Sequence, residues 1–107
     1  MIIVFAGSIG RLPVGGHAWA NLQYLGGLRA LGHEVFCRED CGEGSWVHDG
    51  QADEVRTDLE YPTAYLKACL ELVGMGDRWI YRAGGRSAGM PLESFCDLCA
   101  QADLLLV

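Results

Sequence analysis

The first 36 residues constrain the fold more than any other part of the chain. An apolar, β-branched run at residues 2–5 precedes a glycine-bearing loop over residues 7–16, an amphipathic segment, and a second β-rich run that begins after Gly32. A continuous apolar run is typical of a strand covered on both faces. The order strand, loop, helix, strand predicts a βαβ unit, and in open α/β sheets ligands bind where such loops leave the strand ends.

The helix of this unit is expected to begin at Gly16 or His17 and to end before Gly32, a residue suited to a left-handed cap. Its apolar residues recur at intervals of four, three and three, which gives one stripe along the helix. They are Ala18, Leu22, Leu25 and Leu28. We expect the second strand at residues 35–37.

The remainder of the chain predicts further helices and strands. These are a helix from Pro62 to Gly74, a short extended piece at residues 79–81, a basic, glycine-rich loop at 82–89, a helix that opens at Pro91, and a leucine-rich strand at 104–107. In the helix after Pro91 the residues expected to face inward are Leu92, Phe95, Cys96 and Cys99.

The alternation of strands and helices predicts an α/β fold, a Rossmann-like open parallel sheet with flanking helices. Its length of 107 residues suits one domain, residues 1–107. A leucine-rich strand at the end of an α/β domain lacks the helices that should cover it. We therefore expect a partial domain, the beginning of a larger protein, with open sheet edges.

Residues 38–60 differ in character from their surroundings. Eight of them are acidic, and three glycines break regular structure. We expect a long acidic loop here, and a loop of this length usually belongs to binding or to a lid. A solvated insertion is the alternative.

Charge and hydropathy narrow the classes of partner. A net charge of −6 argues against nucleic acid and anionic membranes, which both require a basic face. No apolar run approaches the roughly 20 residues of a membrane span. Residues 1–6 are apolar but carry no basic segment, so we interpret them as a strand and not as a signal peptide. We expect a cytoplasmic protein.

The five cysteines are odd in number and are not spaced as a disulfide framework. A zinc site from Cys37, Cys41, Cys96 and Cys99 is one interpretation. However, a C-x-x-C inside a helix lacks the turn that structural zinc sites favour. We instead expect no metal, with Cys69, Cys96 and Cys99 as small apolar core residues.

Two common nucleotide-binding motifs are missing. The Rossmann fingerprint G-x-G-x-x-G does not occur, although Glu39 and Asp40 lie where a ribose-binding acid would be. Gly10 and Gly15 have the outer spacing of a phosphate-binding P-loop, but a glycine–histidine pair stands where lysine and serine or threonine are required. We therefore expect no cofactor.

What remains is a glycine pair and a histidine at a helix start, Gly15, Gly16 and His17. Backbone N–H groups at a helix N-terminus favour an anion, and glycines let a diphosphate come close. An imidazole exchanges protons near neutral pH, so His17 is a candidate general base. Alternatively, His17 bonds only to backbone. Arg11 is a candidate phosphate contact, or a solvated side chain.

Residues 13–36, PVGGHAWANLQYLGGLRALGHEVF, resemble the N-terminal motif of GT-B glycosyltransferases. In many of these enzymes a Pro…Gly-Gly loop leads to a helix and then to Ala-Leu-Gly-His-Glu-Val before the second strand. Residues 102–107, ADLLLV, are similar to a later strand of such domains. The resemblance covers the layout of the chain and about a third of it in motif detail. The GHEV segment also occurs in related nucleotide-sugar epimerases.

The resemblance implies a partial N-terminal GT-B lobe, which generally binds acceptor while a second lobe binds the nucleotide sugar. Gly15 and Gly16 would approach the donor phosphates, and in inverting members His17 would act as base on the acceptor hydroxyl. Trp19 and Trp46 are candidate acceptor contacts; otherwise Trp19 packs on the sheet and Trp46 anchors the acidic loop.

The function that this implies is transfer of a sugar from a nucleotide-sugar donor to the hydroxyl of a small acceptor molecule. Without the donor-binding lobe, the 107-residue piece is expected to be inactive alone. Two alternatives stay open. One is a small α/β binding or assembly module that completes its sheet with another chain, or with itself, through open edges. The other is a nucleotide-binding oxidoreductase lobe.

Overall fold

The computed structural model describes residues 1–10, 15–40, 47–49, 54–56, 60–83 and 85–106. In this part of the chain the fold is α/β. The elements in chain order are β1 (Ile2–Ala6), α1 (Gly15–Ala30), β2 (Glu34–Asp40), β3 (Val47–Asp49), β4 (Glu54–Arg56), α2 (Glu60–Glu71), β5 (Trp79–Ala83), β6 (Arg86–Gly89), α3 (Leu92–Gln101) and β7 (Leu104–Leu106).

The main sheet has the strand order β6-β5-β2-β1-β7. Strand β1 pairs in parallel with both β2 and β7, and β2 pairs in parallel with β5. The parallel strands therefore stand in the chain order 3-2-1-4, as in a Rossmann-like fold, and the order reverses between β1 and β7. The predicted α/β class is confirmed, but the sheet is mixed and not purely parallel, because β6 is antiparallel to β5.

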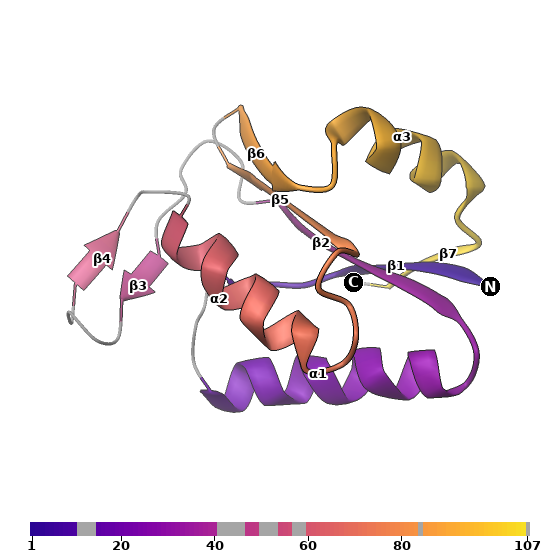
Figure 1. Ribbon diagram of the computed structural model, residues 1–107, viewed down its shortest axis with the longest axis horizontal. Helices are drawn as coiled ribbons and strands as arrows, with labels where there is room; N and C mark the ends of the chain where they lie inside the picture. The colour runs from indigo at the N-terminus through magenta and orange to yellow at the C-terminus, as the bar shows by residue number, and fades with distance from the viewer. Residues whose placement is uncertain (11–14, 41–46, 50–53, 57–59, 84, 107) are drawn as a thin grey trace.

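Helices α1 and α2 lie on one face of the sheet and α3 lies on the other (Figure 1). The larger core cluster fills the first face and contains Leu22, Leu25, Val35, Leu66 and Tyr81. The smaller cluster, Val4, Ile80 and Phe95, lies under α3. Ile80 and Tyr81, neighbours in β5, belong to different clusters. Successive side chains of a strand point to opposite faces of the sheet.

Helix α1 ends as the sequence predicts. Gly32 has a φ of +90°, a conformation that a side chain would strain. Its N–H donates to the carbonyl of Arg29, and the N–H of His33 donates to the carbonyl of Leu28. This pair of bonds is a Schellman cap, which sets the turn into β2.

The expectation of a basic, glycine-rich loop at residues 82–89 is wrong. Residues 79–83 form a buried strand, and residues 86–89 return antiparallel to it as β6. Gly89 makes this close return possible, since its φ is +91° and a Cβ there would lie 2.5 Å from the carbonyl oxygen of Trp79. The N–H of Met90 donates to that same oxygen, so the chain enters α3 beside the beginning of β5.

Two other expectations are corrected. The acidic segment does not begin at residue 38, because β2 continues to Asp40, and residues 47–49 and 54–56 pair as a small antiparallel hairpin set apart from the main sheet (Figure 1). Helix α3 buries Phe95 as expected, but Leu92, Cys96 and Cys99 are exposed. The core cluster beneath α3 is small, with Val4 and Ile80 as its other buried members, so Phe95 alone of this helix is buried.

The burial of the cysteines differs from the prediction. Cys37 is fully buried in β2, Cys69 is half-buried, and Cys96 and Cys99 are exposed on α3. Among the residues described, no group of three or more His, Cys, Asp or Glu side chains is placed to hold a metal ion. Cys41 lies outside the described residues. None of the described helices is long and apolar enough to cross a membrane.

Candidate functional site

A cavity of about 500 Å³ opens at the carboxyl ends of β1 and β7. This is the place where the strand order reverses, the usual ligand crevice of an open α/β sheet. The end of β1 and its following turn form one wall, helix α1 forms another, and the end of β7 closes the third side. The lining residues are Phe5, Ala6, Gly7, Ser8, Ala20, Asn21, Tyr24 and Leu106.

Three polar side chains form a connected group at this cavity. The Oγ of Ser8 lies 2.7 Å from Nε2 of His17, across the loop that joins β1 to α1. The amide nitrogen of Asn21, one turn further along α1, lies 3.4 Å from the same Nε2. It also donates to the carbonyl oxygen of His17 at 2.8 Å. Ser8 and Asn21 are among the residues that line the cavity, and His17 is not.

These contacts favour one direction for the hydrogen bond between Ser8 and His17. A carbonyl oxygen only accepts, so Asn21 must present its NH₂ group to the carbonyl of His17. The same NH₂ group then faces Nε2, which favours a ring nitrogen that carries a lone pair. The arrangement favours Ser8 as donor and Nε2 of His17 as acceptor, in the tautomer with its proton on Nδ1.

The turn after Ser8 is held by a buried carboxylate. Both carboxylate oxygens of Glu39 accept the backbone N–H of Gly10, at 3.1 and 2.9 Å, and Glu39 is only 1% exposed. Gly10 also approaches the start of α2, where a Cβ would lie 2.6 Å from the carbonyl oxygen of Pro62. Glu39 therefore holds the turn at Gly10. This contact differs from the ribose contact that its position in the sequence suggested.

The predicted donor-phosphate glycines lie at the beginning of α1. Gly15 and Gly16 are exposed, and a Cβ at either residue would meet no atom within 4 Å. The described residues therefore give no packing reason for glycine at these two positions. Arg11 lies outside the described residues.

The predicted acceptor tryptophans do not line the cavity. Trp19 is 62% exposed on α1, so it does not pack on the sheet either. Trp46 lies outside the described residues. The aromatic side chains that line the cavity are instead Phe5 and Tyr24, and Tyr24 is 69% exposed.

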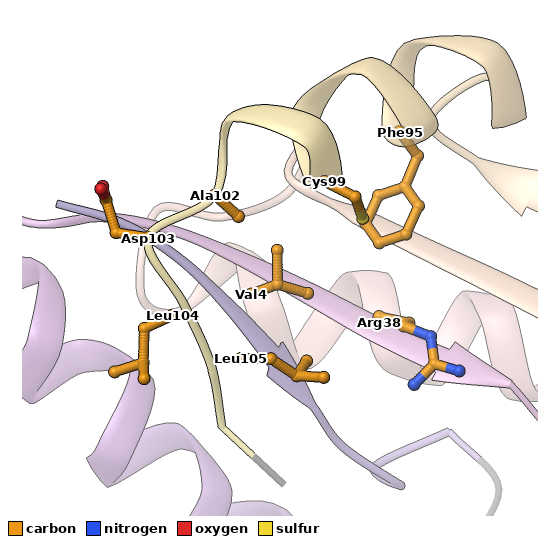
Figure 2. Close-up of a pocket in the computed structure, with 8 residues that line it drawn as sticks. All are labelled: Val4, Arg38, Phe95, Cys99, Ala102, Asp103, Leu104 and Leu105. Carbon is orange, nitrogen blue, oxygen red and sulfur yellow. The ribbon is translucent and has the colours of Figure 1, made fainter.

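A second cavity of about 350 Å³ lies on the opposite face of the sheet, beside α3. Figure 2 shows Phe95 reaching down from α3 toward Val4, with Leu105 below and the guanidinium of Arg38 at one side. The guanidinium also lies 3.8 Å from the carboxylate of Asp40. This cavity is mainly apolar and holds none of the predicted site residues.

Sequence reasoning missed Ser8, Asn21 and Tyr24. The sequence carried a signal for Ser8 and for Asn21. Ser8 directly follows the first strand, where ligand-binding loops begin. Asn21 lies four residues after His17, so on a helix the two side chains are neighbours. Tyr24 gave no distinct signal, because exposed aromatic residues occur on many helices.

Comparisons with known proteins add nothing to this geometry. No family model matches the chain, and neither the curated proteins nor the solved structures contain a match. The cavity and its polar group are therefore the features that indicate a function.

Proposed function

We propose that the chain is the acceptor-binding lobe of a sugar-transferring enzyme of the GT-B type. The cavity between β1, β7 and α1 holds the acceptor, and a donor-binding lobe supplies the nucleotide sugar. The observation that carries this proposal is the Ser8–His17 contact of 2.7 Å at the carboxyl ends of the strands. The contact supports the proposal because an imidazole nitrogen, which can take up a proton, lies within hydrogen-bond distance of a residue that lines a cavity large enough for a small hydroxyl-bearing ligand.

The chemistry follows from the lone pair on Nε2. In an inverting transfer, the acceptor hydroxyl loses its proton to the protein as its oxygen forms a bond to the anomeric carbon of the donor sugar. The bond between that carbon and the diphosphate oxygen breaks, and the diphosphate leaves with the electron pair. His17 is the proton acceptor, and the backbone of Gly15 and Gly16, whose Cβ positions are open, approaches the leaving diphosphate at the start of α1.

The lining of the cavity suits a sugar-like acceptor. Phe5 and Leu106 give an apolar floor, Tyr24 gives an aromatic rim, and Ser8 and Asn21 give hydrogen-bonding groups. Small-molecule sites combine apolar walls with a few placed polar groups in this way. The net charge of −6 disfavours a polyanionic acceptor such as nucleic acid.

An NMR titration of the 107-residue chain tests this proposal. The methyl glycosides of glucose, galactose, mannose and N-acetylglucosamine serve as acceptor probes. We expect at least one of them to shift the amide signals of Ser8, Asn21 and Tyr24 in a saturable manner. If all four leave these signals unchanged, the acceptor-lobe proposal fails.

Completion of the sheet by another chain is the second candidate function. The observation in its favour is the edge strand β7, where Leu104 and Leu105 are 41% and 55% exposed. Exposed apolar edge strands are prone to pair with other strands. Light scattering after size exclusion distinguishes the candidates, since a monomer at 100 μM or so would count against assembly and would leave the acceptor-lobe proposal intact.

A further inference from the structure

We propose that Ser8 is a proton relay between a hydroxyl bound in the cavity and Nε2 of His17. This inference rests on the proposed function and assigns the residue that first receives the acceptor proton. Three observations lead to it: Ser8 lines the cavity, His17 does not, and the hydrogen bond that joins them is favoured in one direction.

The first observation concerns access. Ser8 lines the cavity and His17 does not. Nε2 is already engaged by the Ser8 hydroxyl at 2.7 Å. A hydroxyl that enters the cavity therefore meets Oγ of Ser8 before it reaches the imidazole.

The second observation concerns direction. The Asn21 amide donates to the carbonyl of His17 at 2.8 Å and holds its NH₂ group near Nε2. In that arrangement Ser8 donates its proton to Nε2, which leaves the lone pairs of Oγ free to accept a proton from the ligand. Asn21 is thus a positioning residue, since it keeps the acceptor atom of the imidazole turned toward Ser8.

The proton transfer balances without another reagent. The ligand hydroxyl gives its proton to Oγ of Ser8, and Ser8 gives its own proton to Nε2 of His17. Ser8 ends as a neutral hydroxyl, His17 ends as an imidazolium, and the ligand oxygen ends with the electron pair with which it attacks the anomeric carbon. No bond to Ser8 other than O–H forms or breaks, so Ser8 is not a nucleophile.

The experiment measures the ring ¹⁵N signals of His17 in the 107-residue chain. It compares the wild type, Ser8→Ala and Ser8→Thr, with Ser94→Ala as the control, which removes an exposed hydroxyl from α3. In neutral solution we expect the wild type, Ser8→Thr and the control to show an unprotonated Nε2 and a protonated Nδ1. We expect Ser8→Ala to show a mixture of tautomers. A wild-type ring protonated on Nε2 would reverse the hydrogen bond and overturn the relay.

The second arm adds the methyl glycosides used above. We expect a bound glycoside to shift the Nε2 signal in the wild type and in Ser8→Thr, and this response to be lost in Ser8→Ala. An undiminished response in Ser8→Ala would mean that the ligand contacts His17 directly, which overturns the relay but leaves the acceptor site intact. If no glycoside shifts Ser8, Asn21 or Tyr24, the proposed function fails, and the relay fails with it, whatever the tautomer of the free protein.

Discussion

The N–H of Gly10 points at the buried carboxylate of Glu39, with both oxygens within 3.1 Å. This contact joins the turn after β1 to the end of β2. Gly10 lies two residues after Ser8, so the contact also holds the segment that carries Ser8. The cavity therefore depends on a residue that does not line it.

Replacing Glu39 by Ala should destabilise the protein. The N–H of Gly10 would remain buried without its acceptor, which costs about 1–3 kcal/mol. Urea denaturation of Glu39→Ala measures this loss, with Glu34→Ala as a control at an exposed residue of the same strand. Equal midpoints for the two variants would show that the Gly10–Glu39 contact contributes little.

Gly10 and Gly27 should respond to alanine in opposite ways. A Cβ at Gly10 would lie 2.6 Å from the backbone oxygen of Pro62, whereas at Gly27 it would meet nothing within 4 Å. We expect Gly10→Ala to lose about 1–3 kcal/mol through overpacking. Gly27→Ala, inside helix α1, should gain about 0.5–1 kcal/mol. Thermal unfolding checks both, and a stable Gly10→Ala variant would contradict the packing described for that turn.

The glycine pair at the start of α1 should matter for a ligand and not for folding. A Cβ at Gly15 or Gly16 meets open space, so the alanine variants should stay within about 0.5 kcal/mol of the wild type. If the diphosphate approaches this backbone, each substitution should weaken the binding of UDP or GDP by about tenfold, or 1.4 kcal/mol. Calorimetric titration measures it, and unchanged affinity in both variants would remove the glycines from the donor site.

Alkaline pH should destabilise the protein through Cys37. Burial, and secondarily the negative charge of Glu39, raises the pKa of this thiol well above its usual range. Above a pH of about 8.5 the unfolded thiol loses its proton while the folded thiol keeps it, so the free energy of unfolding falls by about 1.4 kcal/mol per pH unit.

The control for this effect is Cys37→Ala. It should be less stable than the wild type at neutral pH, because it leaves a cavity in the core. However, its stability should fall less steeply than that of the wild type between pH 8.5 and about 10. Urea titrations at several pH values give both slopes, and parallel slopes would mean that the buried thiol titrates normally.

Much of the fold could be predicted because its signals are local. The run at residues 2–5, the apolar stripe of α1 and the cap at Gly32 each follow from spacing along the chain. Strand β6 could not be predicted in this way. Residues 86–89 are polar or small, and their pairing depends on a close return past Trp79 that no periodicity reveals.

The candidate site could likewise be predicted from the sequence only in part. His17 was found because a histidine at a helix start after a glycine pair is visible in the sequence. Its partner Ser8 lies nine residues earlier, and only the course of the loop brings the two side chains together. The role of Glu39 depends on the pairing of β1 with β2, which places the end of β2 beside the turn at Gly10.

Blocking each cavity in turn tests whether the acceptor binds at the carboxyl ends of β1 and β7. Ala20 lines the cavity at β1 and β7, and Cys99 lines the cavity beside α3; both are exposed helical residues. Tryptophan at either position should therefore fold and fill the space in front of it. The measurement is the affinity of the best methyl glycoside for the wild type, Ala20→Trp and Cys99→Trp, followed by NMR.

We predict that Ala20→Trp weakens binding by at least about tenfold, or 1.4 kcal/mol, while Cys99→Trp binds as the wild type does. Wild-type affinity in Ala20→Trp, or loss of binding in Cys99→Trp alone, would contradict the assignment of the acceptor site to the carboxyl ends of β1 and β7.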